Sequence, residues 1–371
     1  MRKRNDQARG AWLRQLKKLP WLILIPLGLY LPDLAAKNPQ WIEENFSNGV
    51  YPHISGAIAF LTSFIKFSLA EFLLYALVLI VTFSLLSLLI GLIFRKVRVV
   101  QFVGFLLSLC VTAGVLLNVF YAVWGLNYAR PALSASMNLN VHERPVGELK
   151  ALSEELAEKA ASLRAQVREN EKGVFYLPDG YESAFAEIPA AYEALNGDIH
   201  LFLSGATVAK PVYYSEGLSY AGLAGVYFPF TAEPNVNVGQ PALLLISSAA
   251  HETAHYMGIA REDEANFMAY LACIHSDDPA IAYSGVMLAL INCASKLYEA
   301  DYAAYASLYA SYSDGMKRDL ADYNVYWDAF EGPVEEAVTE VNDNYLKFNN
   351  QENGVKSYGM MVDLLLAYAN K

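Results

Sequence analysis

The stretch AAHETAHYMGIAREDEANFMAY, from Ala249 to Tyr270, sets the fold and the chemistry of this chain. It contains an HExxH pattern, His251-Glu252-Thr253-Ala254-His255. On a helix, residues four positions apart lie on one face, so both imidazoles can reach a single metal ion. Glu252 then lies beside that ion and can accept a proton. The pattern is typical of hydrolytic zinc sites, so we expect one Zn²⁺ per chain with Glu252 as general base and acid.

The residues around the motif predict two consecutive helices. Pro241 suits the first position of a helix and Gly258 suits its end, which predicts a helix over 241–257. A second helix is expected over 262–275, and the acidic cluster that opens it can supply a third ligand. The metzincin pattern HExxHxxGxxH would place that ligand at position 261, but Arg261 cannot bind zinc.

The acidic cluster resembles the E-x-x-A-D stretch of several gluzincin families. Carried over by position, this resemblance implies that Glu262 is the third zinc ligand beside His251 and His255. It also implies that Asn266 stands where those families have an aspartate that holds a ligand histidine. Glu264 stays the competitor, because on a helix it points about 160° away from Glu262 and only one of them faces the metal easily.

Three further segments carry a wider resemblance. They are WGLNYAR (124–130), FPFTAEPNVN (228–237) and VKSYGMMVDLLLAY (355–368). Together with the HExxH stretch they resemble a bacterial family of membrane-anchored zincin-like proteins of unknown function. The resemblance covers nearly the whole chain and implies a gluzincin-like metallopeptidase, without a known substrate.

Apolar residues concentrate in the first third of the chain. Runs of suitable length predict three transmembrane helices, at about 19–35, 67–94 and 99–124. Residues 1–126 hold 12 Lys/Arg and 5 Asp/Glu, a balance of +7, and residues 127–371 hold 15 and 33, a balance of −18. The acidic second part excludes nucleic acid as a partner, because phosphates would be repelled.

Basic residues predict the orientation in a cell membrane. The basic N-terminus and the turn Arg95–Arg98 are expected to be cytoplasmic, in agreement with three crossings. The membrane region is then 1–126, and 127–371 is an extracytoplasmic zincin-like domain. Both parts have the lipid bilayer as a neighbour, and the sequence does not specify an oligomeric state.

The fold class expected is mainly α with a small β edge sheet. Gly225–Phe230 and Val236–Val238 read as short strands, and Pro229 restricts the first to a sheet edge. Such an edge can pair with an extended peptide, and a purely structural hairpin is the alternative. Residues 37–66 are interpreted as a loop. The other helices are expected at about 146–170, 181–195, 280–310, 314–330, 333–348 and 356–370.

Other residues have weaker signals. Tyr358 can donate to an oxyanion, but a packing role is favoured among 25 tyrosines. Cys273 and Cys293 read as buried thiols, with a disulfide as the alternative in an oxidising compartment.

The function expected is a membrane-anchored zinc metallopeptidase acting on a peptide or protein substrate. Two alternatives share the same motif. One is a non-catalytic, zinc-stabilised membrane sensor or scaffold, and the other is an amidase that acts on cell-wall peptide. The intact Glu252 favours an enzyme over a purely structural zinc site, which would more often have four protein ligands.

Overall fold

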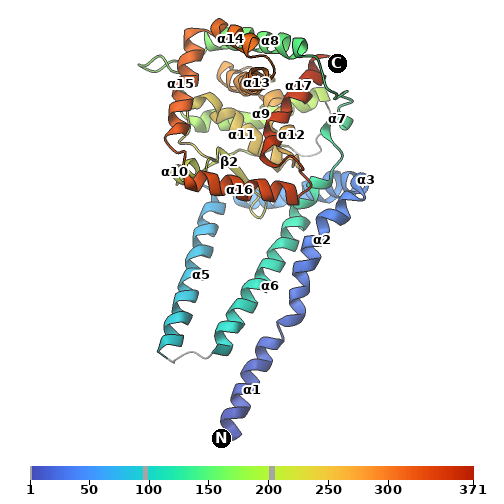
Figure 1. The fold of residues 1–371 in the computed structure, drawn as a ribbon, viewed down its shortest axis with the longest axis vertical. Helices are drawn as coiled ribbons and strands as arrows, with labels where there is room; N and C mark the ends of the chain where they lie inside the picture. Colours follow the sequence, from blue (N-terminus) through green and yellow to red (C-terminus); the bar gives the residue numbers. More distant parts are fainter. Residues whose placement is uncertain (1, 95–98, 200–204) are drawn as a thin grey trace.

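A computed structural model describes residues 2–94, 99–199 and 205–371 of the chain. In this part the fold is mainly helical with one small sheet, as the sequence predicted. Figure 1 shows a stalk of helices beneath a wider head, with the C-terminus on the side of the head away from the stalk. The stalk consists of α1 (Arg2–Leu16), the 3₁₀ turn η1 (Leu19–Ile23), α2 (Leu24–Ala36), α5 (Leu69–Ile93) and α6 (Val99–Val123).

Among the described residues, four helical segments are long and apolar enough to cross a membrane, where the sequence predicted three. They are Arg9–Ala36, Leu69–Ile93, Val99–Val123 and Pro279–Ala300. In the first three at most 17% of the apolar window is buried in the protein, against 67% in the fourth. The fourth segment, α13 (Pro279–Ala300), lies in the head and packs against other helices (Figure 1). Its apolar character therefore fits the core of the head.

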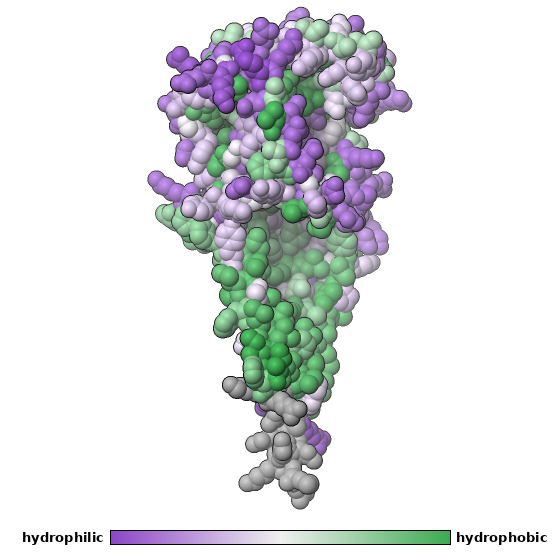
Figure 2. Space-filling model, turned by 60° about the vertical axis from the view of Figure 1, so that its left-hand side comes forward, coloured by the Kyte–Doolittle hydropathy of each residue, from purple (hydrophilic) through white to green (hydrophobic). Residues whose placement is uncertain are grey.

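The surface divides in the same way as the helices. Figure 2 shows apolar side chains over the stalk and polar ones over most of the head. Along α5 only Ala70, Glu71 and Gly91 are buried, so its apolar side chains face outward. An apolar outer surface of this length is typical of a membrane protein. The basic turn Arg95–Arg98, on which the predicted orientation partly rests, lies outside the described residues.

The interpretation of residues 37–66 as a loop is wrong. Most of the segment is helical, because its apolar residues Ile42, Phe46 and Tyr51 are buried against the core of the head. Its mixed polarity reflects helices with one buried face. The elements are α3 (Pro39–Trp41), the π-helix η2 (Ile42–Val50) and α4 (Tyr51–Ser63).

The predicted helix over 280–310 is interrupted. It ends at Ala300, and the carboxylate of Asp301 accepts a hydrogen bond from Ala304 N at 3.0 Å and so caps a new helix. An aspartate at this position favours a helix start. The other elements of the head are η3 (Gly125–Ala129), α7 (Leu133–Ser136), α8 (Val146–Arg164), α9 (Tyr181–Ile199), α10 (Ser215–Tyr220), α11 (Ala242–Tyr256), α12 (Glu262–Ile274), α14 (Tyr302–Ser311), α15 (Asp314–Asp328), α16 (Pro333–Phe348), η4 (Gly354–Met360) and α17 (Met361–Ala369).

The sheet in the described part of the chain has three strands in the order β1-β3-β2. They are β1 (Lys210–Pro211), β2 (Gly225–Phe228) and β3 (Glu233–Val236). β2 runs antiparallel to β3 and lies at the edge, as Pro229 predicted. The second strand was predicted three residues late. It ends at Val236, and the side chain of the next residue, Asn237, donates to Ser219 Oγ at 2.9 Å.

The centre of the head is the packing of α11, α12 and α13. Nearly every residue of α11 and α12 is buried, polar ones included. Cys273 on α12 and Cys293 on α13 are buried free thiols, so the disulfide is not formed. Burial raises the pKa of both to about 12, which keeps them unreactive as thiols.

Carboxylates join the stalk to the sheet. Glu233 at the start of β3 accepts hydrogen bonds from Leu69 N at 3.3 Å and Ala70 N at 2.9 Å, at the N-terminus of α5. Glu71 on α5 accepts in return from Tyr213 N and Tyr214 N at 2.7 and 2.9 Å. Negative charge is favourable at a helix N-terminus, so these contacts fix α5 against the head.

Candidate metal centre

A sharp turn between α11 and α12 brings the acidic cluster back onto the HExxH helix. Gly258 has φ = +87°, a value that glycine adopts without strain at the end of a helix. Ile259 N then bonds to Ala254 O at 3.1 Å. Arg130 donates to Gly258 O at 3.0 Å, and Arg261 donates to Arg130 O at 2.7 Å. The turn is thus held from outside by the segment that follows α6.

The turn places three candidate ligand atoms together. His251 Nε2 lies 3.0 Å from His255 Nε2, and Glu262 Oε2 lies 3.2 Å and 3.3 Å from these two nitrogens. Tetrahedral zinc with bonds of about 2.0–2.1 Å separates its ligand atoms by about 3.3 Å. The three side chains are buried, and their spacing matches one face of such a tetrahedron.

Hydrogen bonds fix how the two rings face the cluster. His251 Nδ1 lies 2.8 Å from Asn266 Oδ1, and His255 Nδ1 lies 2.7 Å from Ile259 O. Both partners are acceptors, so each Nδ1 carries a proton and each Nε2 faces the other ligand atoms. Metal-bound histidines have this arrangement. Asn266 therefore contacts the ring nitrogen that the gluzincin resemblance implied.

The surroundings of Glu262 Oε2 indicate whether the three clustered side chains fit a metal ion. Among the described residues this buried oxygen has no hydrogen-bond partner, although the two histidine Nε2 atoms lie 3.2 and 3.3 Å away. Three lone-pair atoms meeting in a buried space repel one another unless a cation or protons lie between them. One carboxylate and two imidazoles are a donor set that suits zinc. The cluster thus fits a divalent cation.

The same atoms are strongly coupled electrostatically. Burial lowers the pKa of His255, but the neighbouring Glu262 carboxylate outweighs burial and raises that pKa to about 9. Burial raises the pKa of Glu262, while His255 and His251 lower it far below its ordinary value. Glu262 is therefore ionised at neutral pH.

Glu252 is buried beside this cluster and lines two cavities. Burial raises the pKa of Glu252, while His251 and His255 lower it and Glu262 raises it further. A buried carboxylate with a raised pKa suits proton transfer near neutral pH. The edge strand β2 comes very close to it, because a Cβ at Gly225 would lie only 2.7 Å from Glu252 Oε1.

Glu264 does not join the cluster. Its carboxylate accepts hydrogen bonds from Leu133 N at 2.7 Å and from Arg261 at 2.9 Å. Leu133 and Arg261 belong to the two segments that hold the turn between α11 and α12 in place. Of the two glutamates left open by the sequence, Glu262 lies against the histidines and Glu264 holds the scaffold.

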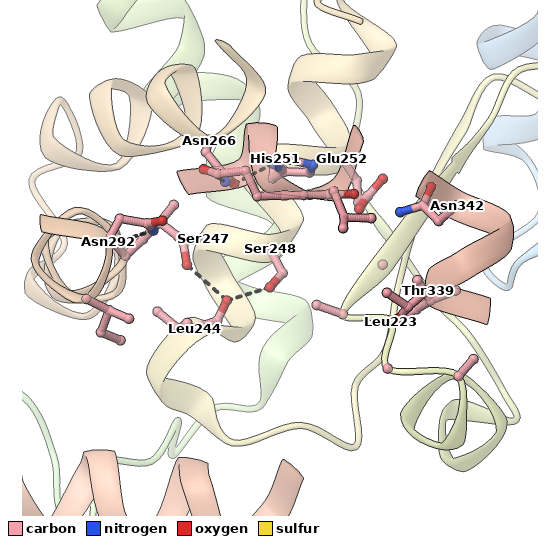
Figure 3. A pocket seen from close by; sticks show the side chains of 18 of the residues that line it. Leu223, Leu244, Ser247, Ser248, His251, Glu252, Asn266, Asn292, Thr339 and Asn342 are labelled. Atoms are coloured by element: carbon pink, nitrogen blue, oxygen red, sulfur yellow. Dashed lines mark hydrogen bonds between the residues drawn. The ribbon is translucent and has the colours of Figure 1, made fainter. Parts of the chain in front are cut away.

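Cavities flank the site on two sides. One, of about 430 Å³, extends from His251 and Glu252 toward Ser248 and Asn292. Figure 3 shows Asn342 and Thr339 of α16 on the opposite side of this cavity from Asn292 and Ser247. The other, of about 380 Å³, extends from the cluster toward α6 and is lined by aromatic side chains. The site is thus reachable from two directions.

Tyr358 of η4 lines both cavities. Its ring stacks on His251, with centroids 6.2 Å apart and planes 19° apart. Burial raises the pKa of Tyr358 well above its ordinary value, and Glu262 adds to this effect. Its hydroxyl is therefore a neutral donor beside the cluster, the state that an oxyanion donor requires.

Several residues at the site had no identifiable signal in the sequence. Asn342 and Tyr345 come from α16, and Phe120 from the end of α6. They lie on helices whose pattern shows only amphipathic or apolar character. Trp124 belongs to the WGLNYAR segment of the family resemblance, but only its contact with α11 gives it a role. Trp124 Nε1 donates to His255 O at 2.9 Å.

Comparison with known proteins gives one match. A family model with the description "Protein of unknown function (DUF3810)" matches residues 46–366. No curated protein and no solved structure matches the chain.

Proposed function

The chain belongs to the DUF3810 family, whose description assigns no activity, and we propose that it is a membrane-anchored zinc metallopeptidase. His251, His255 and Glu262 hold one Zn²⁺ per chain, and Glu252 is the general base and acid. The proposal also includes a gluzincin-like site, with a glutamate as the third zinc ligand, as the sequence resemblance implied. The observation that carries it is the triangle of ligand atoms at 3.0–3.3 Å with Glu252 beside it.

The arrangement supports catalysis better than a purely structural metal site. The chain supplies three ligand atoms, and the cavities beside Glu252 leave space for a water and a substrate. Catalytic zinc sites have three protein ligands and an open position, whereas structural sites are closed by four. The open side of the cluster is therefore the side at which a peptide would bind.

The residues divide the chemistry of hydrolysis among them. When bound, zinc lowers the pKa of a coordinated water and polarises the peptide carbonyl. Glu252 accepts the proton of that water at its carboxylate and passes it to the leaving amine. Asn266 and the carbonyl of Ile259 keep the imidazoles oriented, and Tyr358 donates its O–H toward the negative charge that develops on the carbonyl oxygen.

The proposed topology has three crossings, formed by Arg9–Ala36, α5 and α6. The N-terminus is cytoplasmic, because Arg9, Arg14, Lys17 and Lys18 lie at that end, and the head is extracytoplasmic. α13 is excluded as a crossing because two thirds of its apolar window is covered by the head.

The decisive experiment compares Glu252→Gln with the natural chain. Both full-length proteins are purified in detergent, their zinc is measured by mass spectrometry, and cleavage of a peptide library is followed. We expect about one zinc per chain in both, and a loss of cleavage of about 10²–10⁴-fold in Glu252→Gln. Glu158→Gln, on the exposed side of α8, is the matched control and should cleave normally.

The alternatives give different results in the same experiment. A zinc-stabilised sensor or scaffold would bind the metal and cleave nothing in either chain. An amidase would leave the library intact and release products from cell-wall peptide, again only with Glu252 present. Absence of zinc from the purified natural chain, with no change on chelation, would overturn the whole proposal.

A further inference from the structure

The candidate metal centre lies directly at the end of a membrane helix. α6 ends at Val123, and the next residue, Trp124, donates its indole N–H to the carbonyl of His255. The Trp124 and His255 rings meet edge to face, with centroids 6.0 Å apart. The 6.0 Å between the two ring centroids is no longer than about two residues of extended chain, so the site lies very close to the end of α6. In the proposed topology α6 leaves the lipid near this point, because its apolar span ends at Val123. The site is therefore at the level of the bilayer surface.

The cavity on this side of the site is built partly from the membrane helix. Phe120 and Trp124 line it together with His255 and Glu252. Val341 of α16 also lines it. The cavity thus connects the end of an apolar span with the residues proposed to carry out hydrolysis.

α16 follows the same boundary. Figure 1 shows it lying across the base of the head, directly above the stalk. Its apolar side chains Val334, Val341 and Phe348 are 57%, 69% and 44% exposed. Exposed apolar groups at this level are stable against lipid or against an apolar segment of another chain, and unfavourable in water.

An edge strand determines which kind of molecule fits the cavity. Among the described residues β2 pairs with β3 alone, and its residues Gly225, Val226 and Tyr227 line the cavity beside Glu252. Val226 is 42% exposed. A free strand edge binds an extended polypeptide through main-chain hydrogen bonds. A lipid has no backbone that could use this edge.

We propose that the substrate is a polypeptide anchored in the same bilayer, cut within a few residues of its membrane segment. This inference rests on the proposed peptidase function and specifies the substrate class. The anchor lies in the lipid beside α6 and α16, and the residues just outside it extend along β2 to Glu252. A substrate held in this way binds at the high local concentration that a shared membrane provides.

The first test measures cleavage by the full chain in lipid nanodiscs. The probes share one cleavable sequence selected from the peptide library. In two of them it lies 3 or 40 residues from a single apolar transmembrane helix, and in the third it is free in solution. We expect the 3-residue probe to be cut at least about tenfold faster than the other two. Equal rates for all three, or hydrolysis of the nanodisc lipids in place of the probes, would overturn the inference while zinc-dependent chemistry stands.

The second test detects binding without turnover. A photo-crosslinking residue, p-benzoylphenylalanine, replaces Val341 in the Glu252→Gln chain, and Val325 in the matched control. Val325 lies on α15, is equally exposed at 70%, and does not line either cavity at the site. We expect the 3-residue probe to crosslink at position 341 and not at 325.

The two tests separate failure of the inference from failure of the proposed function. Crosslinking at 341 without cleavage by the natural chain would support the anchored ligand and contradict the peptidase. Cleavage of the soluble probe, with equal crosslinking at 341 and 325, would support the peptidase and contradict the anchored substrate. Neither cleavage nor selective crosslinking would contradict both.

Discussion

The helices beneath the candidate site and the helix that covers it are built very differently. In α11, 13 of 15 residues are buried, including His251, Glu252 and His255. In α16, whose residues are all described, only Leu346 of 16 is buried. The side chains that would hold a metal therefore belong to a rigid core, whereas those that would meet a substrate belong to a thin cover. If the proposed function holds, the buried α11 would provide the geometry for metal binding and the exposed α16 would provide part of the contact with substrate.

The largest expected effect concerns the two glutamates of α12. Glu262→Ala should lower zinc affinity by more than about 100-fold, which exceeds the 10–100-fold cost of losing an outer hydrogen-bond partner. Glu264→Ala should keep zinc and lower the free energy of unfolding by about 1–3 kcal/mol, since Leu133 N loses its buried acceptor. Zinc titration and thermal unfolding of both variants measure the two effects. The opposite pattern would assign the third ligand to Glu264.

A change in the edge strand should damage turnover and leave the metal in place. Gly225→Ala would put a Cβ 2.7 Å from Glu252 Oε1 and 2.9 Å from Asn235 O. Displacement of the base by about 1 Å should reduce cleavage about 100-fold. Gly147→Ala is the control, because no atom lies within 4 Å of its Cβ position. Normal cleavage by Gly225→Ala would show that β2 shifts to make room for the Cβ. The position of Glu252 would then not depend on this strand.

The third effect is a pH dependence of zinc affinity. The pKa of His255 is about 9 when Glu262 is its ionised neighbour, so the imidazole carries a proton at pH 7 and must lose it to bind zinc. Affinity should rise about tenfold per pH unit from pH 7 to 9 and level off above that range. Calorimetry in buffers of different ionisation enthalpy counts the proton released. Affinity independent of pH over this range would mean that His255 is neutral in the protein.

The smallest effect tests the cover itself. Val341→Ala should change the free energy of unfolding by less than about 0.5 kcal/mol, as is usual for exposed positions. Met268→Ala in α12, where the side chain is fully buried, should cost about 2–5 kcal/mol. Denaturant unfolding in detergent compares the two. Similar losses in both variants would show that α16 is an integral part of the core.

The sequence predicted the grouping of His251, His255 and Glu262 better than it predicted the surroundings of these residues. HExxH and the turn at Gly258 act over a few residues, and local geometry alone places His251 above His255. The partner of His251, Asn266, followed from the gluzincin resemblance, carried over by position. Trp124, Asn342 and Tyr345 could not be predicted, because their roles depend on packing between segments more than 80 residues apart in the chain.

The errors in the fold have the same origin. Residues 37–66 looked like a loop because Ile42, Phe46 and Tyr51 are separated by polar residues that face outward. Only their packing in the folded head shows that these three side chains form one buried face. The break at Asp301 was hidden because alanine and tyrosine continue on both sides, and the capping hydrogen bond to Ala304 N is a single local contact. The fourth apolar helix, α13, illustrates that length and hydropathy do not separate a core helix from a lipid-facing one.

The contacts of Tyr51 and Trp124 with the ligand helix have a practical consequence for handling the protein. The hydroxyl of Tyr51 donates to Tyr256 O at 2.6 Å, and the indole of Trp124 donates to His255 O. A recombinant chain that starts at residue 127 would lack both donors and leave two carbonyls of α11 facing solvent. Expression of the head without its stalk should therefore give a poorly soluble or metal-poor product. Purification has to retain the first 126 residues, with a detergent belt or nanodisc around them.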